Sequence, residues 1–118
     1  MLGGEHPETL SSMTNMANAL GDAGQHEEAA AMHREVLAVE RRVLGEEHPH
    51  TLTSMNNLAA ALNKGGRHEE AAAMGREVLA VQRRKLGEKH PDTLISMSNL
   101  AAALDRGGRH EEAAAMHR

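Results

Sequence analysis

The sequence predicts an all-α fold of stacked two-helix hairpins, and two observations support this prediction. The first is a repeat. The letters GGRHEEAAAM stand at residues 65–74 and again at 107–116, and a near-copy, AGQHEEAAAM, stands at 23–32. The copies are 42 residues apart (107 − 65 = 42), and periods of about 20–50 residues are typical of repeat architectures. The second is composition, because helix formers such as Ala, Leu, Met, Glu and Arg dominate and no segment alternates as a strand would.

The repeat divides the chain into three copies. Residues 6–47 and 48–89 are two full repeats, identical at 29 of 42 positions, and residues 90–118 are a truncated third, identical to the second at 23 of 29 positions. We therefore predict a single array over residues 1–118. Two full hairpins and a shortened third amount to about six helices, at two helices per repeat.

The first helix of each repeat is expected to begin at a His-Pro pair. In the middle copy this is His48-Pro49, and proline suits the first helical turn because its missing N–H has no partner there in any case. The apolar residues that follow at helical spacing are Leu52, Met55, Leu58, Ala59 and Leu62. The helix should end at Gly65-Gly66, since glycine permits a tight turn.

The second helix of the middle repeat should begin near His68. An acidic pair at residues 69–70 lies in its first turn and an arginine pair at 83–84 in its last, and both placements suit the helix dipole. Because the connections are short, neighbouring helices should be antiparallel. One hairpin cannot bury its own apolar face, whereas stacked hairpins can, which predicts a solenoid.

This unit resembles the tetratricopeptide repeat, and more narrowly the 42-residue variety found in kinesin light chains and in arrays attached to nucleotide-binding signalling ATPases. The text that carries the resemblance is HPHTLTSMNNLAAALNKGGRHEEAAAMGREVLAVQRRKLGEK. The family's pattern of large residue, Leu, small residue and large residue is matched by Met55, Leu58, Ala59 and Leu62, with the copies Met13, Met16, Ala17, Leu20 and Met97, Leu100, Ala101, Leu104. The resemblance covers essentially the whole chain and implies a right-handed α-solenoid.

The chain departs from the family in having no Phe, Tyr or Trp. Where the family usually has Tyr before the acidic pair, this chain has His26, His68 and His110, which we expect to be half-buried packing residues. A second aromatic site is occupied by His33, Gly75 and His117. We expect the glycine of this set to leave packing space and the core to be looser than in a typical member.

The two ends of the array are expected to be uncapped. Residues 1–3 match the tail of a second helix, and the last helix stops about ten residues early by the repeat length. We expect this end to expose Leu100, Leu104 and Ala114, an apolar patch that favours self-association. A homo-oligomer through the truncated C-terminal helix is therefore one alternative, which the predicted fold alone does not decide.

The resemblance implies a peptide-binding groove on the concave face. In peptide-binding members the first helices line this groove, and an Asn whose amide is both donor and acceptor pairs with the backbone of an extended peptide. The matching residues are Asn15, Asn57 and Asn99, one per repeat. On the same face we expect Asn56, Asn63, Lys64, Ser98 and Arg106 to provide selectivity, the cations by attracting acidic ligand groups. The alternative is that each repeated Asn only satisfies a neighbouring helix.

No catalytic site, cofactor or metal site is predicted. HEEAA lacks the second histidine of the zinc motif HExxH, and the glycine pairs lack the frame of a phosphate-binding loop. His26 and His33 are two helical turns apart, about 10 Å, too far to share one zinc ion. His6, His48 and His90, each before proline, are interpreted as cap or turn residues.

Charge and composition exclude further classes. The formal net charge of −4, with both signs interleaved, disfavours a nucleic-acid partner, which usually meets a basic stripe. No apolar run is long enough for a membrane span, and the lack of cysteine fits a cytoplasmic location. We predict a non-catalytic scaffold that binds an extended peptide of a protein partner. The alternative is a structural assembly module, designed or duplicated, that self-associates through its ends without a ligand.

Overall fold

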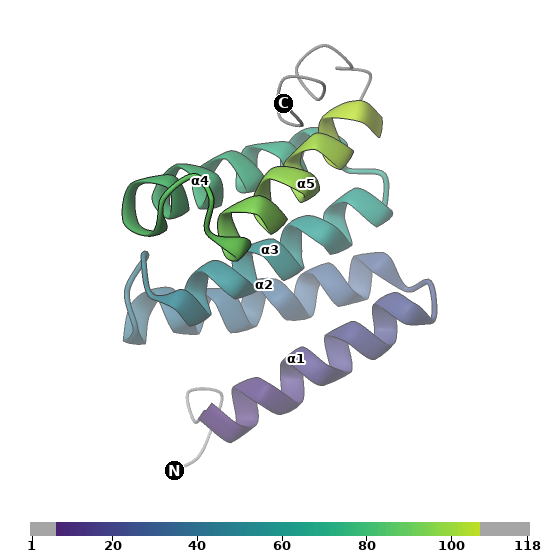
Figure 1. Ribbon diagram of the computed structural model, residues 1–118. Coiled ribbons are helices and arrows are strands. Elements are labelled where there is room, and N and C mark those ends of the chain that lie inside the picture. Colours follow the sequence, from purple (N-terminus) through teal and green to yellow (C-terminus); the bar gives the residue numbers. More distant parts are fainter. Residues whose placement is uncertain (1–6, 107–118) are drawn as a thin grey trace.

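The computed structural model describes residues 7–106, which form five α-helices (Figure 1). They are α1 (Pro7–Asp22), α2 (His26–Val43), α3 (Pro49–Lys64), α4 (His68–Leu86) and α5 (Pro91–Arg106). Within this range there is no strand, and the predicted all-α class is confirmed. The sixth helix that the sequence predicts would fall in residues 107–118, outside the described part of the chain.

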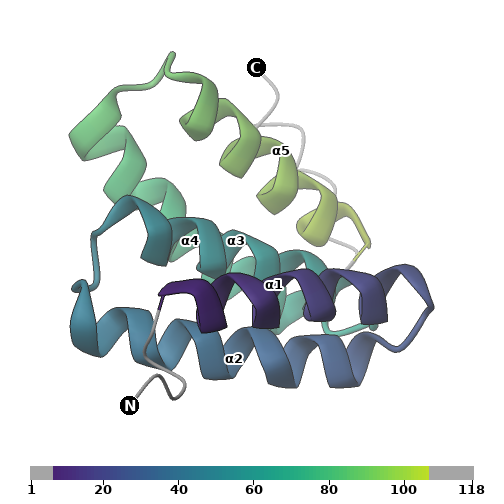
Figure 2. The same ribbon diagram turned by 90° about the horizontal axis from the view of Figure 1, so that it is seen from below.

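Helices that follow one another in the sequence also pack against one another. α1 packs on α2, α2 on α3, α3 on α4 and α4 on α5, and α3 also contacts α5. As a result α1, α3 and α5 succeed one another along one side of the molecule, and α2 and α4 form the other layer (Figures 1 and 2). This is the stack of hairpins that the repeat predicts.

The helix starts and turns follow from local chemistry. The side chain of His48 accepts a hydrogen bond at Nδ1 from the backbone N–H of His50, 3.1 Å away. His90 does the same with the backbone N–H of Asp92, also at 3.1 Å. These bonds confirm the cap role predicted for His48 and His90, whereas His6 lies outside the described residues. The turn after α3 passes through Gly66 at φ 89°, a conformation that glycine adopts without steric cost.

The apolar part of the core consists of Leu, Val, Met and Ala. The apolar stripe predicted for α3 is buried throughout, and Leu58 in its middle is only 2% exposed. Met16 occupies the same repeat position in α1 but is 57% exposed. The difference arises because, among residues 7–106, no helix precedes α1 and covers that face.

One expectation about packing is wrong. Leu100 and Leu104 are buried in the core rather than exposed, because α5 lays its apolar stripe on α4. Beside Gly75, an added Cβ would lie 3.4 Å from both Cβ and Cδ1 of Leu100, which is ordinary contact distance. Leu100 therefore uses the room that the glycine provides. Ala114, the third member of the expected patch, lies outside the described residues.

Ion pairs at the surface connect one repeat to the next. Arg34 of α2 lies 2.9 Å from Glu70 of α4, and this guanidinium holds the pKa of Glu70 below its usual range. Glu47, between α2 and α3, pairs with Arg84 and Lys85 of α4, which lower its pKa likewise. All these side chains are partly exposed, so each pair contributes little stability. The pairs do, however, leave these charged side chains with partners inside the chain.

The buried imidazole of His33 makes stability depend on pH. His33 lies in the core, and desolvation lowers the pKa of its side chain. The unfolded chain binds the proton near the ordinary pKa of about 6.5, whereas the folded chain binds it only at lower pH. The stability of the folded chain is therefore complete above about pH 6.5, and it declines as the pH falls from about 6.5 toward the lowered pKa of His33.

We expect the urea midpoint of the wild type to fall between about pH 7 and 5, and to fall less in His33→Leu. The other histidines are common to both chains, so the difference between the two slopes isolates His33. Urea titrations followed by circular dichroism at several pH values measure this difference. Equal slopes would show that His33 does not carry the effect.

Candidate functional site

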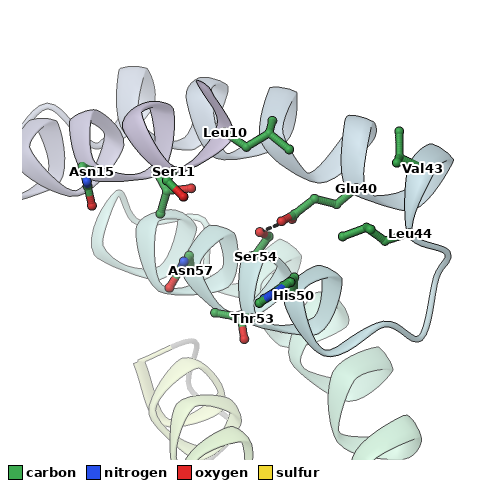
Figure 3. A pocket seen from close by; sticks show the side chains of 11 residues that line it. Leu10, Ser11, Asn15, Glu40, Val43, Leu44, His50, Thr53, Ser54 and Asn57 are labelled. Atoms are coloured by element: carbon green, nitrogen blue, oxygen red, sulfur yellow. Dashed lines mark hydrogen bonds between the residues drawn. The ribbon is translucent and has the colours of Figure 1, made fainter. Parts of the chain in front are cut away.

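Three cavities lie between the first helices of successive repeats. The α1–α3 pocket, of about 420 Å³, is lined by residues that include Leu10, Asn15, Glu40, Val43, Leu44 and Asn57 (Figure 3). The α3–α5 pocket, of about 510 Å³, is lined by residues that include Asn56, Asn57, Gln82, Leu86, Ile95 and Asn99. The end pocket, of about 190 Å³, lies near the C-terminal ends of α3 and α5 and includes Asn63, Lys64, Gly75, Asn99 and Arg106.

The three cavities form one continuous surface, which we call the groove. Asn57 lines both the α1–α3 and the α3–α5 pocket, and Asn99 lines both the α3–α5 and the end pocket. Because each shared asparagine borders two cavities, neighbouring cavities adjoin one another at Asn57 of α3 and at Asn99 of α5. The groove therefore runs across α1, α3 and α5.

The structure brings the three repeated asparagines together in this groove. Asn15 is exposed, whereas Asn57 and Asn99 are half-buried. Each lies at the same position of its helix, and equivalent positions of stacked repeats share a face. In Figure 3, Asn15 projects from α1 and Asn57 from α3.

Two of the predicted selectivity residues already have partners within the chain. Nδ2 of Asn56 donates to Oγ of Ser96 at 3.0 Å, and Ser96 in turn donates to the side-chain oxygen of Gln82. Oδ1 of Asn63 lies 2.6 Å from Nδ1 of His68, across the turn between α3 and α4. Both asparagines line the groove, but part of their hydrogen-bonding capacity holds helices together.

The remaining predicted residues divide between the groove and its margin. Lys64 and Arg106 are exposed and line the end pocket. Ser98 is exposed but lines none of the three cavities. It occupies the position of Asn56 one repeat later, and so lies on the side of α5 that faces away from α3.

The sequence analysis missed two polar residues at the floor of the groove. Glu40 is 8% exposed and lines the α1–α3 pocket, and its repeat equivalent Gln82 is 5% exposed and lines the α3–α5 pocket. Glu40 accepts a hydrogen bond from Ser54, as Gln82 does from Ser96. A signal was present, because Glu40 continues the helical spacing of the buried residues His33, Val36 and Leu37. A charged side chain is seldom buried unless another group pairs with it, so a glutamate on an apolar stripe is a candidate functional residue.

Exposed apolar side chains gather at the same groove. Val43 and Leu44 line the α1–α3 pocket, and Leu86 and Ile95 line the α3–α5 pocket. These are four of the six large apolar residues that are exposed in the described part of the chain. A cavity with exposed apolar walls and a few convergent polar groups has the composition of a binding site.

Residues 7–106 contain no group of three or more His, Cys, Asp or Glu side chains that could hold a metal ion. Over the same range, each helix is too short or too polar to cross a membrane.

Comparison with known proteins gives two kinds of match. The family described as tetratricopeptide repeat matches residues 8–84 and 66–118. Two crystal structures of a Podosopora anserina protein, described as a kinesin light chain with nearly identical TPR-like repeats, superpose with TM-scores of 0.87 and 0.86 at 34% identity. The match covers 97% of this chain and 54% of that protein, so the chain spans about half its length. No curated protein sequence matches.

More distant structures share the fold alone. BtubC (BKLC) from P. vanneervenii has a TM-score of 0.84 at 23% identity, over 95% of this chain and 45% of its own. The TPR domain of Arabidopsis FLU has a TM-score of 0.77 at 18% identity, over 92% and 87%. Tetratricopeptide repeats serve in general as non-catalytic protein-interaction scaffolds. The family match over nearly the whole sequence, together with the shared helical stack, shows that this chain belongs to the tetratricopeptide repeat family and is of the kinesin-light-chain type.

Proposed function

We propose that the chain is a non-catalytic scaffold whose groove binds an extended segment of a partner protein. The observation that carries this proposal is the composition of the groove. Four exposed apolar side chains share its two larger pockets with the repeated asparagines. Contiguous exposed apolar surface with polar groups among it is typical of protein interaction sites.

In the proposed mechanism, different groove residues contact the main chain and the side chains of the bound peptide. Asn15, Asn57 and Asn99 pair with the peptide main chain, because each amide offers a donor and an acceptor. The apolar walls of the two larger pockets receive ligand side chains. Lys64 and Arg106 attract an acidic group at the end pocket, where both line the wall. Asn56 and Asn63 assist through the hydrogen-bonding capacity that their intrachain partners leave free, whereas Ser98, which lines none of the cavities, has no part in this mechanism.

The double variant Asn57→Ala/Asn99→Ala tests this function. We expect peptides selected on the wild type from an extended-decapeptide array to bind the variant about tenfold more weakly, since each lost hydrogen bond contributes about 0.5–1.5 kcal/mol. Fluorescence polarisation gives the dissociation constants. Glu35→Ala is the matched control, because Glu35 is an exposed residue of α2 and lines none of the three cavities.

Circular dichroism establishes that both variants keep the helical content of the wild type. Equal affinity of the double variant and the wild type for the same peptides would overturn the groove function. If no peptide binds and sedimentation shows mass rising with concentration, the alternative of a self-associating assembly module replaces it.

A further inference from the structure

We propose that the α1–α3 pocket accepts a lysine or arginine side chain of the partner segment and that Glu40 recognises its positive charge. This inference rests on the groove function proposed above and assigns a ligand chemistry to one of its pockets. Four observations carry it: the burial of Glu40, its lack of a cationic partner, the walls of the pocket and the contrast with Gln82.

Glu40 is a carboxylate almost withdrawn from water. It is 8% exposed, and one of its oxygens accepts a hydrogen bond from Ser54 of α3. Within the part of the chain that the structure describes, no ion pair joins Glu40 to Lys, Arg or His. By contrast, Glu70 on the outer layer and Glu47 at the rim of the α3–α5 pocket each have an arginine partner.

This arrangement favours a cation from outside the chain. Burying a carboxylate is costly unless an opposite charge accompanies it. A ligand ammonium or guanidinium that reaches Glu40 would supply that charge. The hydroxyl of Ser54 would meanwhile continue to orient the carboxylate.

The walls of the pocket suit the long stem of a basic side chain. Leu10 of α1, Val43 of α2 and Leu44 just beyond it lie on either side of Glu40 (Figure 3). Lysine and arginine bury their methylene groups along apolar surface while the charged head seeks a polar partner. The other titratable side chain in the wall is His50, on α3.

The α3–α5 pocket provides the contrast. Its floor carries Gln82 at the repeat position of Glu40, with the same hydrogen bond from a serine of the next helix. At its rim, Glu47 is already paired with Arg84 and Lys85. The two pockets thus share their construction and differ in the charge at the floor. The floors of the two pockets therefore differ in charge, and the basic residue of the ligand lies in the α1–α3 pocket.

The test compares Glu40→Gln with the reciprocal variant Gln82→Glu. Glutamine at residue 40 keeps an acceptor for Ser54, as Gln82 does for Ser96, so the fold should be retained. The probe is a positional library of extended nonapeptides, read out as dissociation constants. The wild type should select Lys or Arg at one position, and replacing that residue by norleucine should weaken binding about tenfold, because the charged hydrogen bond is lost.

Glu40→Gln should remove this preference, so that the lysine and norleucine peptides bind equally. Gln82→Glu should add a second basic preference at another position of the peptide, because it places the same charge at the floor of the α3–α5 pocket. Both variants are checked for unchanged circular dichroism.

The possible outcomes distinguish a failure of this inference from a failure of the groove function on which it rests. A wild type that binds peptides without preferring Lys or Arg overturns the inference and leaves the groove function intact. If Glu40→Gln still prefers Lys or Arg at that peptide position, the inference is likewise overturned and the groove function is left intact. A wild type that binds no peptide overturns both.

Discussion

Replacing Leu58 by alanine is expected to lower the free energy of unfolding by about 2–5 kcal/mol. Leu58 is buried in α3, the central helix of the described array, which contacts α2, α4 and α5. Helices on several sides prevent the cavity from collapsing, so contacts are lost as well as transfer free energy. Since whole domains are stable by only about 5–15 kcal/mol, this single change should shift the unfolding transition strongly.

The array contains its own control for this prediction. Met16 stands at the same repeat position in α1 but is mostly exposed, and Met16→Ala should change stability by about 0.5 kcal/mol or less. Urea unfolding followed by circular dichroism is the suitable measurement, because the chain has no Trp or Tyr for fluorescence. Similar losses in both variants would contradict the burial difference on which the prediction rests.

Ser96→Ala is expected to cost about 1–3 kcal/mol, the penalty for a buried polar group left without its partner. Ser96 is completely buried in α5, where it donates to Gln82 of α4 and accepts from Asn56 of α3. Alanine fills nearly the same space but leaves both amides without this partner. The loss should therefore come from hydrogen bonding and not from a cavity.

A double variant and a matched site test this cause. Adding Gln82→Leu to Ser96→Ala should recover part of the loss, since removing both partners is less costly than removing one, and a double-mutant cycle measures the coupling. Ser12 is the equivalent serine of α1 and is exposed, so Ser12→Ala should be nearly neutral. If it cost as much as Ser96→Ala, the polar junction would not be the source.

These pairs show how residues of one repeat position acquire different roles. Met16 and Leu58 share a position but not an environment, and so do Ser12 and Ser96. His33 and Gly75 are equivalent as well, yet one places an imidazole in the core and the other admits Leu100. The sequence pattern identifies the position, whereas the neighbouring helix decides what the side chain does there.

The sequence by itself determined the helices, their turns and the shared face of Asn15, Asn57 and Asn99. These follow from helical periodicity and covalent spacing, which act within a few residues of each other. Only the tertiary structure decided that Leu100 is buried and that Glu40 faces a pocket. These properties depend on which distant helix covers a given face, and that is set by contacts between segments far apart in the chain.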